Sequence, residues 1–184
     1  LLHGGGQTRH AWRTTAEKLA GRGFTAIAID QRGHGDSAWV DSGAYALEDY
    51  GREAAWLGQE IERRFGAKPV AIGASLGGLA SLYALGQAAC FSALVLVDIA
   101  PRLEASGVAN IRDFSKRVQG KGFISLDEAA EVVAAYLPHR AKPRSTDGSR
   151  KNLKQRADGR WYWHWHWYWH WDPRFLDGPR RVDG

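Results

Sequence analysis

The sequence contains one cysteine, Cys90, and no methionine, not even at position 1. A single cysteine excludes an internal disulfide, and without a second one there is no Cys-x-x-Cys zinc or redox motif. No run of about 18 apolar residues is present, and no charged-then-apolar leader opens the chain, so the sequence predicts neither a membrane span nor a signal peptide. A cytoplasmic location is therefore expected. Because the chain opens inside an apolar run, we also expect it to be a piece of a longer protein.

The composition is that of a soluble globular protein, with 44% hydrophobic and 24% charged residues in a chain of 184. This length can bury a core and needs no more than one domain with an appendage. The net charge of +5 is concentrated between residues 140 and 160, where eight lysines and arginines stand against two aspartates. The rest of the chain is close to neutral, which argues against a nucleic-acid surface extending over the whole protein.

Short apolar runs alternate with stretches of helical periodicity over residues 1–101. Strands are expected at residues 1–2, 25–30, 69–72 and 93–98, and helices at 11–20, 47–65 and 76–85. The apolar runs show no polar alternation, as is typical of parallel strands that are covered on both faces. The pattern predicts an α/β fold with a parallel sheet and right-handed crossovers.

The character changes after residue 101. A capping box at residues 125–128 opens a helix that is expected to reach Leu137, another helix is expected over 110–118, and a basic helix over 149–156. No strand is predicted between 102 and 160. We therefore expect residues 1–101 to form a partial α/β core and residues 102–184 to form a helical cap region over the C-terminal edge of the sheet.

Residues 161–171 alternate tryptophan with tyrosine or histidine, and the pentad 161–165 recurs as 167–171. As a strand, this segment would place every tryptophan on one face. The short period indicates a local duplication of an apolar cap segment rather than a repeat array. The alternatives are a metal site at His164 and His166, for which no further ligands can be located, and a stacking platform for single-stranded nucleic acid.

The residues 70–80 read as a strand, a tight turn and a helix, with Ser75 at the turn in Gly73-x-Ser75-x-Gly77. Such a turn lifts a serine hydroxyl clear of the sheet and places the first amides of the helix beneath it. Acyl transfer by a serine also needs a base, an acid that orients the base, and two N–H donors for the oxyanion. A glycine-rich turn without chemistry is the alternative interpretation.

One oxyanion donor would be the amide of Leu76, the first residue of the helix. The other would come from the loop Gly4–Gly6, because glycines let backbone amides turn toward an anion. The alternative for this loop is a frayed N-terminus.

Three glycine-containing loops follow three successive predicted strands: His3-Gly4-Gly5-Gly6, Asp30-x-Arg32-Gly33-His34-Gly35, and Gly73-x-Ser75-x-Gly77. In this order and spacing they resemble the α/β-hydrolase family, in its branch of cofactor-free esterases, lactonases and perhydrolases. The resemblance implies that Ser75 is the nucleophile and that the oxyanion donors are Gly5 and Leu76, with Gly6 the weaker choice. It also implies that Asp30, Arg32 and His34 have a structural role in their loop, and that no cofactor or metal is needed.

The family's catalytic histidine and, in most members, its acid follow strands that lie beyond this sequence. Asp98, after the strand at 93–97, is where some members place the acid, although a turn-capping role is the alternative interpretation. None of the chain's histidines follows a strand in the expected place; they are His3, His10, His34, His139, His164, His166 and His170.

The leading hypothesis is a serine hydrolase that acts on a small ester-like substrate, a carboxylic ester or lactone, and that is inactive or weak as this piece alone. The alternatives are a basic and aromatic module at 140–171 that binds single-stranded nucleic acid, and a non-catalytic remnant. Neither a membrane nor, in the leading hypothesis, a nucleic acid is a partner.

Overall fold

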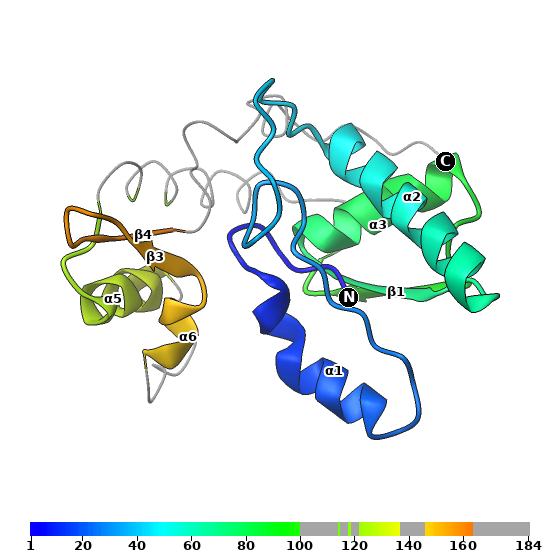
Figure 1. Ribbon diagram of the computed structural model, residues 1–184, viewed down its shortest axis with the longest axis horizontal. Helices are drawn as coiled ribbons and strands as arrows, with labels where there is room; N and C mark the ends of the chain where they lie inside the picture. The colour runs from blue at the N-terminus through cyan, green and yellow to red at the C-terminus, as the bar shows by residue number, and fades with distance from the viewer. Residues whose placement is uncertain (100–113, 115–117, 119–121, 137–145, 164–184) are drawn as a thin grey trace.

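The computed structural model describes residues 1–99, 114, 118, 122–136 and 146–163, and the description below is confined to them. Figure 1 shows two groups of elements. Helices α2 and α3 lie together with strand β1, and α1 lies near them, whereas α5, α6, β3 and β4 form a second group. No helix among the described residues is long and apolar enough to cross a membrane.

The central sheet is parallel, as the sequence predicts. Strand β1 (Val70–Ala74) pairs with β2 (Ala93–Val97), with Val70 opposite Ala93 and Ala74 opposite Val97. Leu2 forms parallel bridges to both Ile29 and Gly73. The order across the sheet is therefore Ile29, Leu2, β1, β2, and it confirms the predicted α/β class.

The strand expected at 25–30 is wrong in extent, because only Ile29 takes part in a bridge. The terminal amine of Leu1 donates to the carbonyl of Ile27 at 2.7 Å, and the Ile29 amide donates to Leu1 at 3.4 Å. Leu1 and Leu2 are the only described residues that offer this segment a partner. A strand needs a neighbour along its length, so the remaining residues stay outside regular structure.

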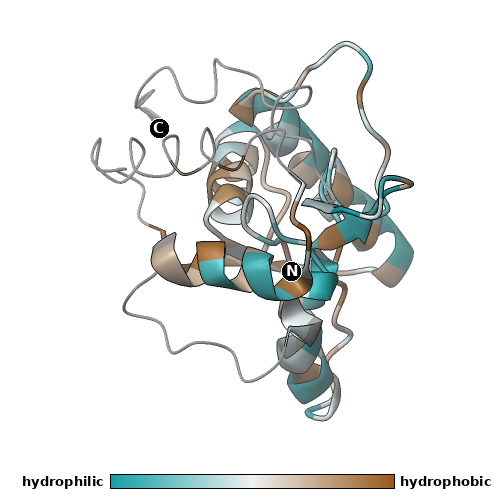
Figure 2. Ribbon diagram, turned by 90° about the vertical axis from the view of Figure 1, so that its left-hand side faces the viewer, coloured by the Kyte–Doolittle hydropathy of each residue, from teal (hydrophilic) through white to brown (hydrophobic). Residues whose placement is uncertain are grey.

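The helices of the core follow the predicted periodicity. A 3₁₀ turn η1 (Arg9–Trp12) leads into α1 (Arg13–Ala20), and α2 (Leu47–Phe65) and α3 (Leu76–Gln87) follow. The Ala46 amide donates to the Asp49 carboxylate at the start of α2, and Gly66, with φ 74°, ends it. The helices in Figure 2 contain both hydrophobic and hydrophilic residues, as expected for amphipathic helices that pack one face against a core.

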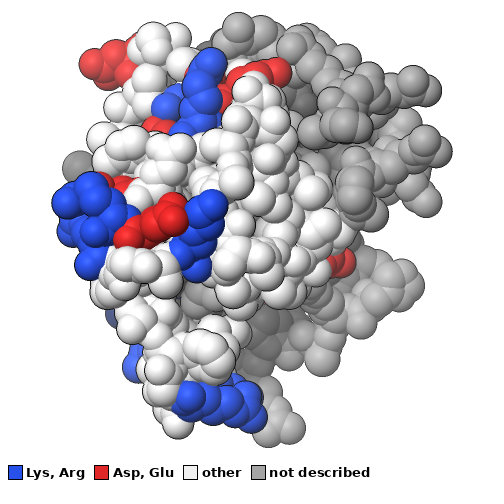
Figure 3. Space-filling view, turned by 90° about the vertical axis from the view of Figure 1, so that its right-hand side faces the viewer, with Lys and Arg blue, Asp and Glu red and all other residues white. Residues whose placement is uncertain are grey.

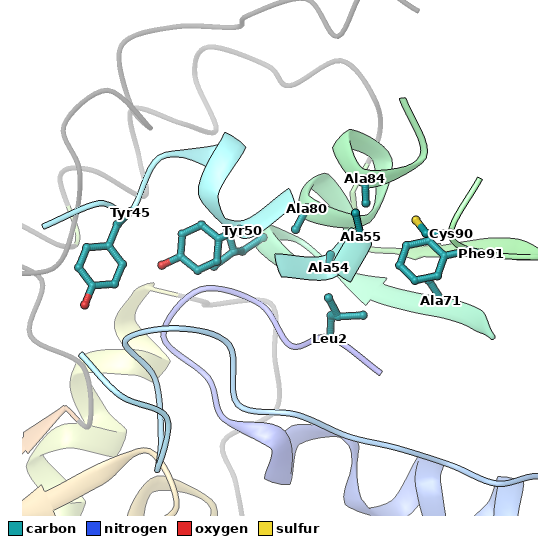
Figure 4. Close-up of a cluster of buried hydrophobic side chains, with 11 residues drawn as sticks. Leu2, Tyr45, Tyr50, Ala54, Ala55, Ala71, Ala80, Ala84, Cys90 and Phe91 are labelled. Atoms are coloured by element: carbon teal, nitrogen blue, oxygen red, sulfur yellow. The ribbon is translucent and has the colours of Figure 1, made fainter. Parts of the chain in front are cut away.

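The hydrophobic core depends on small residues between α2 and α3 (Figure 4). Ala54 and Ala55 of α2 lie against Ala80 and Ala84 of α3, and Leu2 packs beneath them. A Cβ added at Gly51 of α2 would lie 2.8 Å from Cβ of Tyr83 in α3, closer than two such atoms can approach. The close approach of the two helices therefore depends on residues that keep their side chains small.

Charges of both signs are interspersed on the face of the molecule in Figure 3. Along α2, Arg63 and Arg64 both pair with Glu60, at 2.7 and 2.5 Å. Hydrogen bonds from these two arginines lower the pKa of the Glu60 carboxyl to about 2. These are ion pairs on the helix surface, and because the opposite charges offset each other they do not form a patch of one sign.

The second group combines helices with a hairpin. Helix α5 (Leu126–Tyr136) and the short α6 (Asp147–Arg150) precede β3 (Leu153–Gln155), which pairs antiparallel with β4 (Trp161–Trp163). Phe114 and Val118 are helical, but the rest of the helix expected at 110–118 lies outside the described residues, as does Leu137.

The basic helix predicted at 149–156 is wrong, and so is the absence of a strand before 160. Helix α6 ends at Arg150, and Leu153 begins β3 with only 2% of its surface exposed. Leu153 is the one apolar residue of that segment, which cannot give a helix a buried face. Pairing with β4 instead buries Leu153 beside Phe123, Trp161 and Trp163.

Candidate active site

Ser75 lies between the end of β1 and the start of α3, in a strained backbone conformation. Its φ of 44° and ψ of −113° depart from the usual regions for a residue with a side chain. Such strain persists only where the surroundings enforce it, and it marks functional sites more often than others. Ser75 is half-buried rather than enclosed.

The two flanking glycines are required by contact distances. A Cβ added at Gly73 would lie 2.5 Å from the carbonyl carbon and oxygen of Gly77. A Cβ added at Gly77 would lie 2.4 Å from the carbonyl oxygen of Leu2. All of these neighbours are backbone atoms, so no side chain larger than hydrogen fits at either position without moving the chain.

The opening glycines form a turn beside Ser75. The Gln7 amide donates to the carbonyl of Gly4 at 3.1 Å, and Gly6 has a φ of 77°. A positive φ at the third residue is what a type II turn requires. A Cβ added at Gly4 would lie 3.4 Å from Cβ of Ser75. The turn and the serine are therefore in contact range.

Backbone hydrogen bonds hold the start of the chain against both arms of the Ser75 turn. Leu2 donates to the Ile72 carbonyl at 2.9 Å and accepts from the Ala74 amide at 3.0 Å. The carbonyl of His3 accepts from the Gly77 amide at 3.2 Å. The opening turn is thus fixed relative to the strand before Ser75 and to the helix after it.

All but one of the backbone N–H groups of the turn Gly4–Gln7 donate a hydrogen bond to a described residue. Gly4 donates to Oε1 of Gln7 at 3.0 Å, Gly6 donates to Nε2 of His34 at 3.2 Å, and Gln7 donates to Gly4. Among the described residues the Gly5 amide has no acceptor, and Gly5 is exposed. The Leu76 amide, the first of α3, has none there either, because a helix leaves its first N–H groups unpaired.

His3 and His34 are buried, and their ring nitrogens are hydrogen-bonded. Nε2 of His3 accepts from the Gln31 amide at 3.0 Å, so its Nδ1 carries the proton and donates to the Gly4 carbonyl at 2.8 Å. Nε2 of His34 accepts from Gly6, and Nδ1 donates to the Arg32 carbonyl at 2.9 Å. Burial, and then the nearby His3, lower the pKa of His34 to about 3. Burial likewise lowers the pKa of His3.

The loop from Asp30 to Ser37 is held by ion pairs and amides. Asp30 accepts from the Arg9 guanidinium, from the Arg9 amide at 2.6 Å and from the Asp36 amide at 3.1 Å. Burial alone would raise the pKa of Asp30, but these hydrogen bonds lower it below its usual value. Arg32 donates to the Ala44 carbonyl at 2.5 Å and to Glu53 at 2.7 Å. These contacts connect the loop to η1 and to α2.

Asp98 follows directly after β2 and is exposed. The Ser75 amide donates to the carbonyl of Val97 at 3.3 Å, so Asp98 and Ser75 lie at the same end of neighbouring parallel strands. Asp98 has a φ of 55°, in the left-handed region that aspartate tolerates better than most residues. Its role as an acid remains a prediction.

The structure places the turn Gly4–Gln7 and the first residue of α3, Leu76, next to Ser75, but none of the hydrogen bonds given above for the described histidines involves the serine. His3 and His34 are engaged as above, His10 is exposed on η1, and the remaining four histidines lie outside the described residues. No group of three or more potential metal ligands occurs among the described residues. Sequence reasoning missed Gln7, since nothing in the glycine motif shows that the next side chain folds back onto it.

A family model described as "alpha/beta hydrolase fold" matches residues 1–171. Esterase Rv0045c of Mycobacterium tuberculosis is 32% identical over 166 residues, which are 88% of this chain and 54% of that protein. A solved structure of that esterase superposes with a TM-score of 0.66 at 29% identity, covering 89% of this chain and 56% of the other. The structure of E-2-(acetamidomethylene)succinate hydrolase is similar in fold, with a TM-score of 0.79 at 20% identity over 95% of this chain and 62% of that one. The chain thus spans about half the length of the curated relative that it matches.

Proposed function

Because the chain belongs to the α/β-hydrolase fold family, we propose that it carries the nucleophile and oxyanion site of a serine hydrolase acting on a small carboxylic ester or lactone. The observation that carries this proposal is the strained, half-buried Ser75 between the turn Gly4–Gln7 and the start of α3, two segments whose Gly5 and Leu76 amides have no acceptor among the described residues. The esterase named among its relatives supports an ester as the substrate class.

In this proposal the Ser75 hydroxyl oxygen attacks the ester carbonyl carbon, and the carbonyl oxygen becomes an oxyanion that the Gly5 and Leu76 amides bind. Collapse of this intermediate expels the alcohol and leaves an acyl-enzyme, which water then hydrolyses. The serine proton must go to a base. Neither buried histidine is available for this, since Nε2 of each already accepts a backbone N–H.

Because none of the described histidines is in place as a base, we propose that the chain by itself turns over weakly or not at all. Losing one member of a catalytic triad typically costs about 10⁴-fold or more in rate, although binding and the oxyanion site still give some catalysis over water. Asp98 is kept as the candidate acid. The cytoplasmic location expected from the sequence stays a proposal as well.

The test is hydrolysis of p-nitrophenyl acetate by the chain, by Ser75→Ala and by Ser92→Ala, an exposed serine that lies away from the turn. We expect slow hydrolysis by the unaltered chain and by Ser92→Ala, and only the buffer rate with Ser75→Ala. Equal rates for all three proteins would remove Ser75 from the mechanism. Fast, Ser75-dependent turnover would instead contradict the proposal that the chain by itself supplies no base.

A further inference from the structure

In the turn Gly4–Gln7, the backbone alone does not fix which way the central peptide, between Gly5 and Gly6, points. The two central residues of the turn are both glycines, and glycine populates positive and negative φ about equally. The peptide between them can therefore stand either way round: with the Gly6 N–H on one side and the Gly5 carbonyl on the other, or the reverse. These two states correspond to the two common turn types, which differ mainly by a flip of this central peptide.

One side chain from a distant loop distinguishes the two orientations. Nε2 of His34 accepts the Gly6 N–H at 3.2 Å, across 28 residues of sequence. Because Nδ1 donates to the Arg32 carbonyl at 2.9 Å, Nε2 carries no hydrogen and can only accept. A flipped peptide would aim the Gly5 carbonyl at this nitrogen and leave two acceptors facing each other.

The imidazole itself has little freedom to adjust. His34 is only 2% exposed, and its ring lies 5.0 Å from that of His3 and 6.5 Å from that of Tyr50. Gln7 acts at the other end of the turn, where Oε1 takes the Gly4 N–H at 3.0 Å. With both acceptors in place, Gly5 is left as the one amide of the turn without an acceptor among the described residues.

We infer that His34 is a positioning residue of the acyl-transfer site: by holding the Gly5–Gly6 peptide it keeps the turn Gly4–Gln7 in one conformation, and the adjoining Gly4–Gly5 peptide, which carries the Gly5 N–H, keeps its place next to Ser75. Gln7 has the same role at Gly4. The catalytic part of this inference rests on the proposed function, whereas the hydrogen bond between Gly6 and His34 can be tested without any activity.

The first experiment is NMR on the isotope-labelled chain. We expect a scalar coupling between the Gly6 nitrogen and Nε2 of His34, the Nδ1–H tautomer of His34, and amide exchange that is slow at Gly6 and fast at Gly5. Absence of the coupling together with equally fast exchange at both glycines would overturn the inference. This measurement needs no variant, so a folding defect cannot obscure it.

The second experiment compares His34→Leu with His34→Gln and Tyr45→Phe. Tyr45 is a matched control, because its buried hydroxyl also accepts one backbone N–H, from Val40 at 2.8 Å, but lies in another loop. We expect His34→Leu to lose Gly6 protection and to lower the Ser75-dependent kcat about 10²-fold or more with little change in KM, the cost of one oxyanion donor. His34→Gln, which keeps an acceptor, should restore part of both.

Tyr45→Phe should lose protection at Val40 but keep the Gly6 protection and the kcat. An unchanged kcat in His34→Leu, or equal losses in His34→Leu and Tyr45→Phe, would refute the positioning role. If the unaltered chain shows no Ser75-dependent hydrolysis, the proposed function is not supported for this chain, and the NMR result still decides whether His34 holds the turn.

Discussion

Gly77 and Gly86 are both in α3, but they have opposite surroundings. A Cβ at Gly77 would meet the backbone of Leu2, whereas nothing lies within 4 Å of a Cβ at Gly86. Packing therefore requires a glycine at position 77, whereas Gly86 has no packing role and only lowers the helix propensity of α3. This contrast gives a pair of substitutions with opposite expected signs.

Gly77→Ala should lower the free energy of unfolding by roughly 2–4 kcal/mol, because the overpacked backbone must shift. Gly86→Ala should raise it by up to about 1 kcal/mol through helix propensity. Urea unfolding followed by circular dichroism measures both. A stable Gly77→Ala would show that the contact with Leu2 does not exist in solution.

The buried His34 gives a pH dependence of stability with a definite sign. Its pKa falls from 6.5 to about 3 on folding, so the unfolded chain binds the proton first as the pH drops. The contribution of neutral His34 to the free energy of unfolding is complete above about pH 6.5 and is lost as the pH falls toward 3. The full shift corresponds to roughly 5 kcal/mol, of which about 2–3 kcal/mol should be lost by about pH 4.5.

His34→Gln removes this titration, so the variant should lose less stability than the unaltered chain between about pH 7 and 4.5. Urea midpoints at the two pH values provide the comparison. Identical losses in the two proteins would mean that His34 is not neutral and buried. His3, whose pKa is also lowered by burial, is present in both proteins, so the difference between them reports the titration of His34 together with its coupling to His3.

The sequence predicts the local turn around Ser75 but not the hydrogen bond between Gly6 and a distant side chain. The Gly73-x-Ser75-x-Gly77 motif locates the turn, because its conformation is set by neighbours a few residues away. The partner of Gly6 is His34, 28 residues on, and no local pattern encodes that hydrogen bond. The contact of Gln7 with Gly4 is local, but glutamine is not among the residues whose side chains characteristically bond to a turn, so the sequence does not indicate it.

Among the elements, α2 was predicted to the residue and β3 was missed. Apolar positions repeat along α2 every three or four residues, and a glycine ends it. Residues 149–156 contain one apolar side chain, Leu153, so no periodicity could identify them as a helix or a strand. Their structure is decided by pairing with β4, a contact with another segment.

Helix α5 begins with a hydrogen bond that can be tested by one substitution. Oγ of Ser125 accepts the Glu128 amide at 3.1 Å, and the Glu128 carboxylate accepts the Ile124 amide at 2.6 Å. Ser125→Ala should cost about 1 kcal/mol in the stability of this helix, while Ser125→Asp should cost little. Amide exchange along 126–135 reports the change. Equal exchange in both variants would show that the cap does not stabilise α5.

At the scale of the whole molecule, the predicted parallel order is present, but the chain spans only about half of its curated relative. Among the described residues β2 has a strand on one side only, and Val95 and Val97 are 45% and 37% exposed. The sequence could not show which faces of the sheet are covered, because coverage depends on segments distant in sequence.

The aromatic residues 161–163 are half-buried, and their rings contact other side chains. Trp161 and Trp163 pack against the second hydrophobic cluster, and the guanidinium of Arg156 lies 4.1 Å from the ring centre of Tyr162. Base stacking needs such ring faces to be accessible. The described tryptophans of this segment therefore take part in packing, which leaves less ring surface for a base to stack on.

We accordingly expect no saturable binding of a fluorescein-labelled single-stranded oligonucleotide at about 0.15 M salt, and only weak, salt-sensitive association below that. Fluorescence anisotropy measures it, with the segment 140–160 neutralised as the control. Tight binding that the neutralised variant loses would favour the nucleic-acid alternative.

The central claim, that Ser75 is a nucleophile beside two donors, is tested most directly by covalent labelling. The chain, Ser75→Ala and Ser92→Ala are incubated at length with excess fluorophosphonate probe, and the adducts are mapped by mass spectrometry. The account predicts one slow adduct, on Ser75, in the first and third proteins and none in the second. The same labelling in Ser75→Ala, or no adduct on Ser75 in the unaltered chain, would contradict it.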